Sequence, residues 1–85
     1  MAELGGRGSL VGSLEALVAF GEASLSVMRA RSALHDRGPG ARRTLAEVHA
    51  AHTRLQELFA VGDTDVFEQA LTVIVLARRA VELWT

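Results

Sequence analysis

Residues 9–40 read SLVGSLEALVAFGEASLSVMRARSALHDRGPG, and this stretch decides the fold class. It has no proline before Pro39, and its apolar residues recur at the three- and four-residue spacing of a helix. Ser9 or Ser13 can cap the start, because a serine oxygen accepts hydrogen bonds from the free amides of a first turn. Gly38 permits a left-handed exit, and Pro39 cannot continue the hydrogen-bond ladder. The stretch therefore predicts a helix over residues 9–36.

Two further helices follow from the same start and stop signals. Residues 41–61 keep one apolar stripe and end before Gly62, which suits a helix terminus. A third periodic segment covers residues 64–84, with Asp63 or Thr64 as its cap. Because the breaks are short, consecutive helices should lie antiparallel. We expect an all-α, three-helix antiparallel bundle that assembles into a homodimeric helical bundle.

The length and composition of the chain favour association with a partner. The chain has 85 residues and no cysteine, and a single core of this size supplies only about 3–5 kcal/mol, so such domains usually add a metal or oligomerise. Residues 1–8 contain three glycines and no periodicity, which predicts a flexible lead before a single domain over 9–85. The chain has nine arginines, no lysine and ten acidic residues, which give a net charge of −1. A charge this small favours binding to neither nucleic acid nor an anionic membrane. We expect a bacterial, cytoplasmic protein.

The helix over 9–36 is apolar on two sides. One stripe comprises Val11, Leu14, Val18, Gly21, Leu25 and Met28, and the other Phe20, Ala23, Val27, Ala30 and Leu34. A three-helix monomer cannot bury both without leaving a sizeable patch exposed. We expect the second stripe to form the seam with a second copy, and a different protein is the alternative occupant. The predicted binding residues are Phe20, Val27 and Leu34, joined by Val75, Leu76 and Leu83 of the third helix.

The histidines are the candidate metal ligands. His49 and His52 lie three residues apart on one helix, and imidazole suits zinc and similar ions. The Glu-x-x-His pair of di-iron bundles is missing at each histidine, and His52 occupies a position on the apolar stripe. We therefore expect no cofactor.

Residues 29–37 (RARSALHDR) resemble the phosphoacceptor helix of one class of bacterial histidine kinases. The resemblance implies that His35 receives a phosphoryl group and that Asp36 orients or deprotonates it. The sequence departs from that family at Gly38 and Pro39, where the family's helix continues. An ordinary helix end with His35 and Asp36 near solvent is the alternative interpretation.

Two other enzyme classes share features with the chain. Arg29 to His35 and Arg43 to His49 repeat an Arg-x5-His spacing that resembles helical ribonucleases of the HEPN type, although the Asn, Asp or His usual after the arginine is replaced by Ala30 and Thr44. Size and helix number are also similar to chorismate mutases, but the lysine of those enzymes is absent here. The preferred hypothesis is a non-enzymatic interaction or regulatory protein. The alternative is a small enzyme or phosphotransfer module centred on His35 and Asp36.

Overall fold

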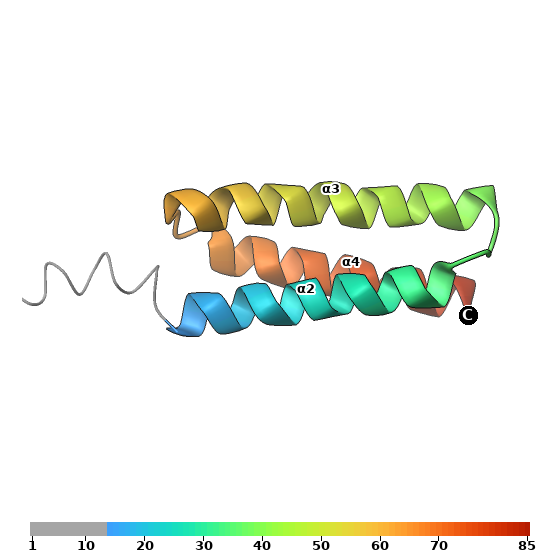
Figure 1. Ribbon diagram of the computed structural model, residues 1–85, viewed down its shortest axis with the longest axis horizontal. Coiled ribbons are helices and arrows are strands. Elements are labelled where there is room, and N and C mark those ends of the chain that lie inside the picture. The colour runs from blue at the N-terminus through green and yellow to red at the C-terminus, as the bar shows by residue number, and fades with distance from the viewer. Residues whose placement is uncertain (1–13) are drawn as a thin grey trace, which may run out of the picture.

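The computed structural model describes residues 14–85 and folds them into three α-helices, α2 (Leu14–Leu34), α3 (Pro39–Val61) and α4 (Val66–Trp84) (Figure 1). Helices α2 and α4 run in the same direction, α3 runs opposite to both, and all three pairs are in contact. The predicted all-α three-helix bundle is therefore confirmed. The expected lead over 1–8 and the caps at Ser9 or Ser13 lie outside the described residues.

The turn between α2 and α3 differs from the prediction. Asp36, two residues after α2 ends, adopts a left-handed conformation with φ at 64°, and Gly38 also has a positive φ of 104°. The amide of Arg37 donates to the carbonyl of Leu34 across 3.2 Å. Helix α3 begins at Pro39 itself, because the fixed φ of proline suits a first helical position, where an amide would lack a partner. The break is therefore shifted toward the N-terminus relative to the prediction.

The turn between α3 and α4 ends α3 at the predicted glycine. Gly62 is left-handed (φ 71°, ψ 30°), and its amide donates to the carbonyl of Phe59 across 3.3 Å. The amide of Asp63 donates to the carbonyl of Leu58 across 3.0 Å, which completes a Schellman motif. The carboxylate of Asp63 accepts the amide of Asp65 across 2.8 Å. Its side chain thus orders the turn just before α4 and does not cap the helix.

The core between α2 and α4 is built largely from small side chains. The buried residues of α2 are Ala16, Ala23, Val27, Ala30 and Leu34, and those of α4 are Val66, Ala70, Val73, Ala77 and Ala80. On both helices they follow the alternating three- and four-residue spacing that keeps two parallel helices facing each other. Alanine lets helix axes approach closely, since interaxial distance depends on the side chains at the contact. Helix α3 closes the third side with Ala41, Val48, Leu55 and Leu58.

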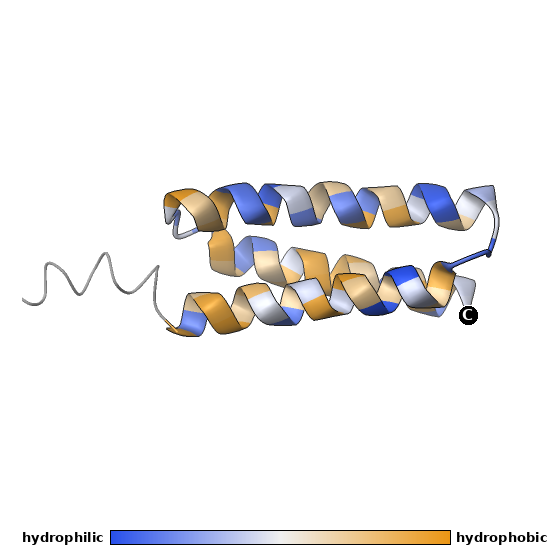
Figure 2. Cartoon of the chain, viewed as in Figure 1, coloured by the Kyte–Doolittle hydropathy of each residue, from blue (hydrophilic) through white to orange (hydrophobic). Residues whose placement is uncertain are grey.

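The apolar stripe of α2 that was predicted to be exposed is buried, and the stripe predicted to be buried is exposed. Val27 and Leu34 are each only 3% exposed, and Phe20 is half-buried and stacks on Phe59 with ring centroids 4.7 Å apart. This placement corrects the prediction that Phe20, Val27 and Leu34 form an outer seam. The physical reason is that the alanines interspersed on this stripe let it pack against α4. The larger side chains of the opposite stripe stay outside, and α2 is visibly hydrophobic over much of its first half (Figure 2).

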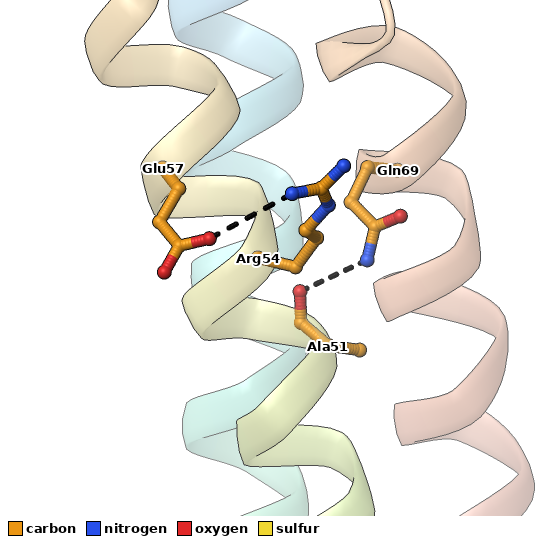
Figure 3. Close-up of polar contacts among 4 residues, drawn as sticks. All are labelled: Ala51, Arg54, Glu57 and Gln69. Atoms are coloured by element: carbon orange, nitrogen blue, oxygen red, sulfur yellow. Dashed lines mark hydrogen bonds and ion pairs between the residues drawn. The ribbon is translucent and has the colours of Figure 1, made fainter.

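A side-chain hydrogen bond links the middle of α3 to the first half of α4. The Nε2 of Gln69 donates to the backbone carbonyl of Ala51 across 3.0 Å (Figure 3). Next to it on α3, Arg54 and Glu57 form an exposed ion pair across 3.8 Å, which contributes little to stability. The contact of Gln69 therefore does more to fix the register of the two helices than the ion pair does.

Candidate interaction surface

His35 and Asp36 are brought together at the end of α2, but in solvent. Nδ1 of His35 lies 3.2 Å from Oδ2 of Asp36, with the two side chains 77% and 87% exposed. Arg31 and Arg42 line the same shallow groove. An exposed pair of this kind is weakly held, and the surrounding groove does not exclude water. The residues proposed for phosphotransfer are thus adjacent but not enclosed.

His52 has a structural environment between α2 and α3. Its Nε2 and the Oγ of Ser24 form a hydrogen bond of 2.9 Å, and its ring stacks on Phe20 with centroids 5.9 Å apart. Burial, with a smaller contribution from His49, lowers the pKa of His52 below its ordinary value. Across residues 14–85, no three His, Cys, Asp or Glu side chains gather closely enough to hold a metal ion. His49 and His52 therefore lack a third ligand in the described chain.

The most prominent surface feature is a row of apolar side chains on α2, which we call the outer stripe. It consists of Leu14, Leu17, Val18, Leu25 and Met28, which are 74%, 54%, 49%, 46% and 60% exposed. Gly21 lies among them and is also exposed. Sequence reasoning identified this row, except Leu17, but assigned it to the core. The regular alanines of the other stripe were the signal that distinguishes the packed face from the free one.

The apolar surface continues from α2 onto α4. Phe67, at the start of α4, lines a shallow groove together with Leu14 and Val18 of the outer stripe. Leu71 and Val75 follow Phe67 at successive helical turns and are 61% and 40% exposed. Val75, one of the binding residues predicted from sequence, is thus exposed on α4. Phe67 thus connects the outer stripe of α2 with exposed apolar side chains of α4.

Leu76 and Leu83, the other predicted residues of α4, belong to a different place. They line a groove between α3 and α4 with Val48 and Arg79. Leu83 is 71% exposed, whereas Leu76 is half-buried. This α3–α4 groove is a second, smaller apolar surface on the described chain.

Charge is segregated along the bundle, although the whole chain carries a net charge of only −1. In the described chain, the half that contains the α2–α3 turn holds seven arginines and three carboxylates, a net of +4. The half that contains the α3–α4 turn holds one arginine and six carboxylates, a net of −5. The seven arginines are Arg29, Arg31, Arg37, Arg42, Arg43, Arg78 and Arg79, and the six carboxylates are those of Glu15, Glu22, Glu57, Asp63, Asp65 and Glu68. The bundle therefore has a basic end and an acidic end.

Comparison with known proteins adds no relative: no family model, curated protein or solved structure matches the chain. Within the described region, none of the helices has the length and apolar content that crossing a bilayer requires. The inference of function therefore rests on the surface of the bundle.

Proposed function

We propose that this chain is a non-enzymatic interaction protein that associates with a second copy of itself through the outer stripe of α2. One observation carries the proposal: five large apolar side chains are exposed along a single face of α2, although the other face of the helix already packs into the core. Contiguous exposed apolar patches on small domains mark interaction sites, since burying them removes hydrocarbon from water. Helix-to-helix association through such a face is a common mode of recognition.

The contribution of one side chain sets the scale of the test. Leu25 is 46% exposed, and fully burying a leucine contributes about 1.5–3 kcal/mol, so covering the exposed half contributes about 1 kcal/mol. A symmetric dimer contains the residue twice, which makes Leu25→Ala cost about 2 kcal/mol. That energy corresponds to a dissociation constant raised roughly 30-fold. Leu25→Glu should weaken association further, because it places a carboxylate in the interface.

Analytical ultracentrifugation at micromolar concentration tests the proposal. We expect the wild type to sediment as an oligomer and Leu25→Glu to sediment as a folded monomer. Gln56→Glu introduces the same charge on the exposed face of α3 and should leave the oligomer intact. If Leu83→Glu dissociates the oligomer and Leu25→Glu does not, the α3–α4 groove is the contact. A monomeric wild type at these concentrations overturns self-association altogether.

The second candidate function is phosphotransfer centred on His35. It is favoured by the 3.2 Å contact with Asp36 and by the flanking arginines. In such a step the phosphoryl group of acetyl phosphate would pass to an imidazole nitrogen of His35 and release acetate. Mass spectrometry of the wild type and of His35→Ala tests it. Labelling that depends on His35 supports phosphotransfer, whereas an unlabelled chain whose oligomer is unaffected by His35→Ala supports the interaction function.

A further inference from the structure

We propose that the second copy docks antiparallel on the outer stripe, with the two-fold axis beside Gly21, so that Leu14 of each copy meets Met28 of the other. This inference rests on the proposed function and specifies the orientation of the contact. Two independent observations carry it: the symmetry of the outer stripe about Gly21 and the segregation of charge along the bundle.

The outer stripe is nearly symmetric about Gly21. Leu14 and Met28 lie seven residues to either side of Gly21, and Val18 and Leu25 lie three and four residues away. Reversing the direction of the helix therefore brings large apolar side chains opposite one another at both ends. A two-fold dimer requires this kind of self-complementary surface, because the same patch supplies both sides of the contact.

Gly21 itself has no role in the packing of the monomer. A Cβ added there would have no heavy atom within 4 Å, and the residue lies in mid-helix, where glycine is unfavourable. At the centre of a helix–helix crossing, the missing side chain lets the two backbones approach. Glycine at this position is therefore explained by a partner helix and not by the fold of one chain.

Charge selects the antiparallel orientation over the parallel one. On α2, Glu15 lies N-terminal to Gly21, Arg29 and Arg31 lie C-terminal to it, and Glu22 lies next to the proposed two-fold axis. Antiparallel docking brings Glu15 of each α2 near Arg29 of the other, and it sets the acidic end of each bundle beside the basic end of the other. Parallel docking would place like charges together along the full length of the contact, which is unfavourable.

Cysteine cross-linking tests the orientation, because the natural chain contains no cysteine. Two single-cysteine variants, Leu14→Cys and Met28→Cys, are prepared as folded full-length chains, and one of them carries a mass tag. Both positions are exposed. The two variants are mixed and oxidised. The antiparallel dimer should give the mixed 14–28 disulfide several-fold above the 14–14 and 28–28 products, since facing residues alone meet the distance requirement of a disulfide. Gly21→Cys should link to itself, and Gln56→Cys on α3 should not link.

Salt dependence provides a second readout on the unmodified chain. Raising the ionic strength from about 0.05 to about 0.5 M shortens the Debye length from about 14 to about 4 Å. We expect the dimer to dissociate more readily at high salt by several-fold. Dominant 14–14 and 28–28 disulfides, with a dimer that tightens at high salt, overturn the antiparallel orientation while leaving self-association intact. Absence of any oligomer in the wild type overturns both proposals.

Discussion

The contact between Gly40 and Trp84 leads to a specific prediction about stability. The indole of Trp84, in the last turn of α4, lies over the first turn of α3. Its Nε1 donates to the Oγ1 of Thr44 across 3.1 Å, and that hydroxyl donates to the carbonyl of Gly40 across 3.2 Å. A Cβ added at Gly40 would lie 2.7 Å from Cη2 of the indole and 3.1 Å from Cζ2. Gly40→Ala must therefore displace the ring.

The expected cost follows from what the ring loses. Displacing the indole breaks its hydrogen bond to Thr44, a net contribution of about 1 kcal/mol, and crowding in a packed contact costs about 1–3 kcal/mol. The gain in helix propensity, at most about 1 kcal/mol, offsets part of this. We expect Gly40→Ala to lower the free energy of unfolding by about 1–2 kcal/mol. The corresponding fall in Tm is about 4–8 °C per kcal/mol for a domain of this size.

Gly21→Ala is the matched control, because it makes the same chemical change in a helix where nothing lies within 4 Å of the new methyl group. It should raise the free energy of unfolding by about 0.5–1 kcal/mol. Both variants are compared by urea denaturation at concentrations where the chain is monomeric, using circular dichroism and the fluorescence of the single tryptophan. In a Trp84→Leu background, Gly40→Ala should lose its cost. Equal and stabilising effects of the two alanines would refute the reasoning.

Three further predictions concern other parts of the bundle. Asp36→Gly should raise the free energy of unfolding by about 0.5–1 kcal/mol in urea titrations, because Asp36 has a φ of 64°, which glycine adopts without strain. Folding lowers the pKa of His52, so the unfolded chain binds more protons than the folded chain. The contribution of His52 to the free energy of unfolding should therefore be full above about pH 6.5 and should fall at lower pH. The urea midpoints measured at about pH 8 and about pH 5 should differ less in His52→Gln than in the wild type. Val27→Glu should cost several kcal/mol and unfold the domain, as seen by circular dichroism, because it buries a charge at a position 3% exposed, whereas Leu25→Glu should remain helical.

The helices themselves were predictable because strong local signals mark their ends. Gly62 ends α3 as predicted, since few residues other than glycine adopt its left-handed backbone conformation without strain. The first break was less accurately placed, because Asp36 adopts a left-handed conformation before Gly38, the glycine to which the prediction assigned the exit. Pro39 is the first residue of α3, whereas the prediction had placed it in the break between the helices. Local chemistry thus determines the number and type of elements more firmly than their final residues.

The inward face of α2 was not predictable from hydrophobicity alone. A stripe of leucine, valine and methionine has more apolar surface than one interspersed with Ala16, Ala23 and Ala30. A prediction that buries the larger apolar side chains therefore places the outer stripe in the core, although the structure exposes it. What decides is the match with α4, which presents Ala70, Ala77 and other small residues at the same spacing. The regular alanines of α2 give part of this information, and the matching small residues of α4 give the rest. The face of α2 that was predicted to be exposed is therefore buried, and the opposite face is exposed.

If the proposed dimer forms, the alanine-rich core and the outer stripe together couple folding to association. Alanine buries little apolar area, so the α2–α4 contact stabilises one chain less than a leucine-rich contact of equal length would. The outer stripe forms a continuous face only while α2 is helical, so in the proposed dimer a second copy would bind the folded state alone. Mass action then raises stability by about 1.4 kcal/mol of dimer, or about 0.7 kcal/mol per chain, for each tenfold rise in concentration above the dissociation constant. The thermal midpoint of the wild type should rise with concentration, and that of Leu25→Glu should stay constant; a midpoint independent of concentration in both would separate folding from association.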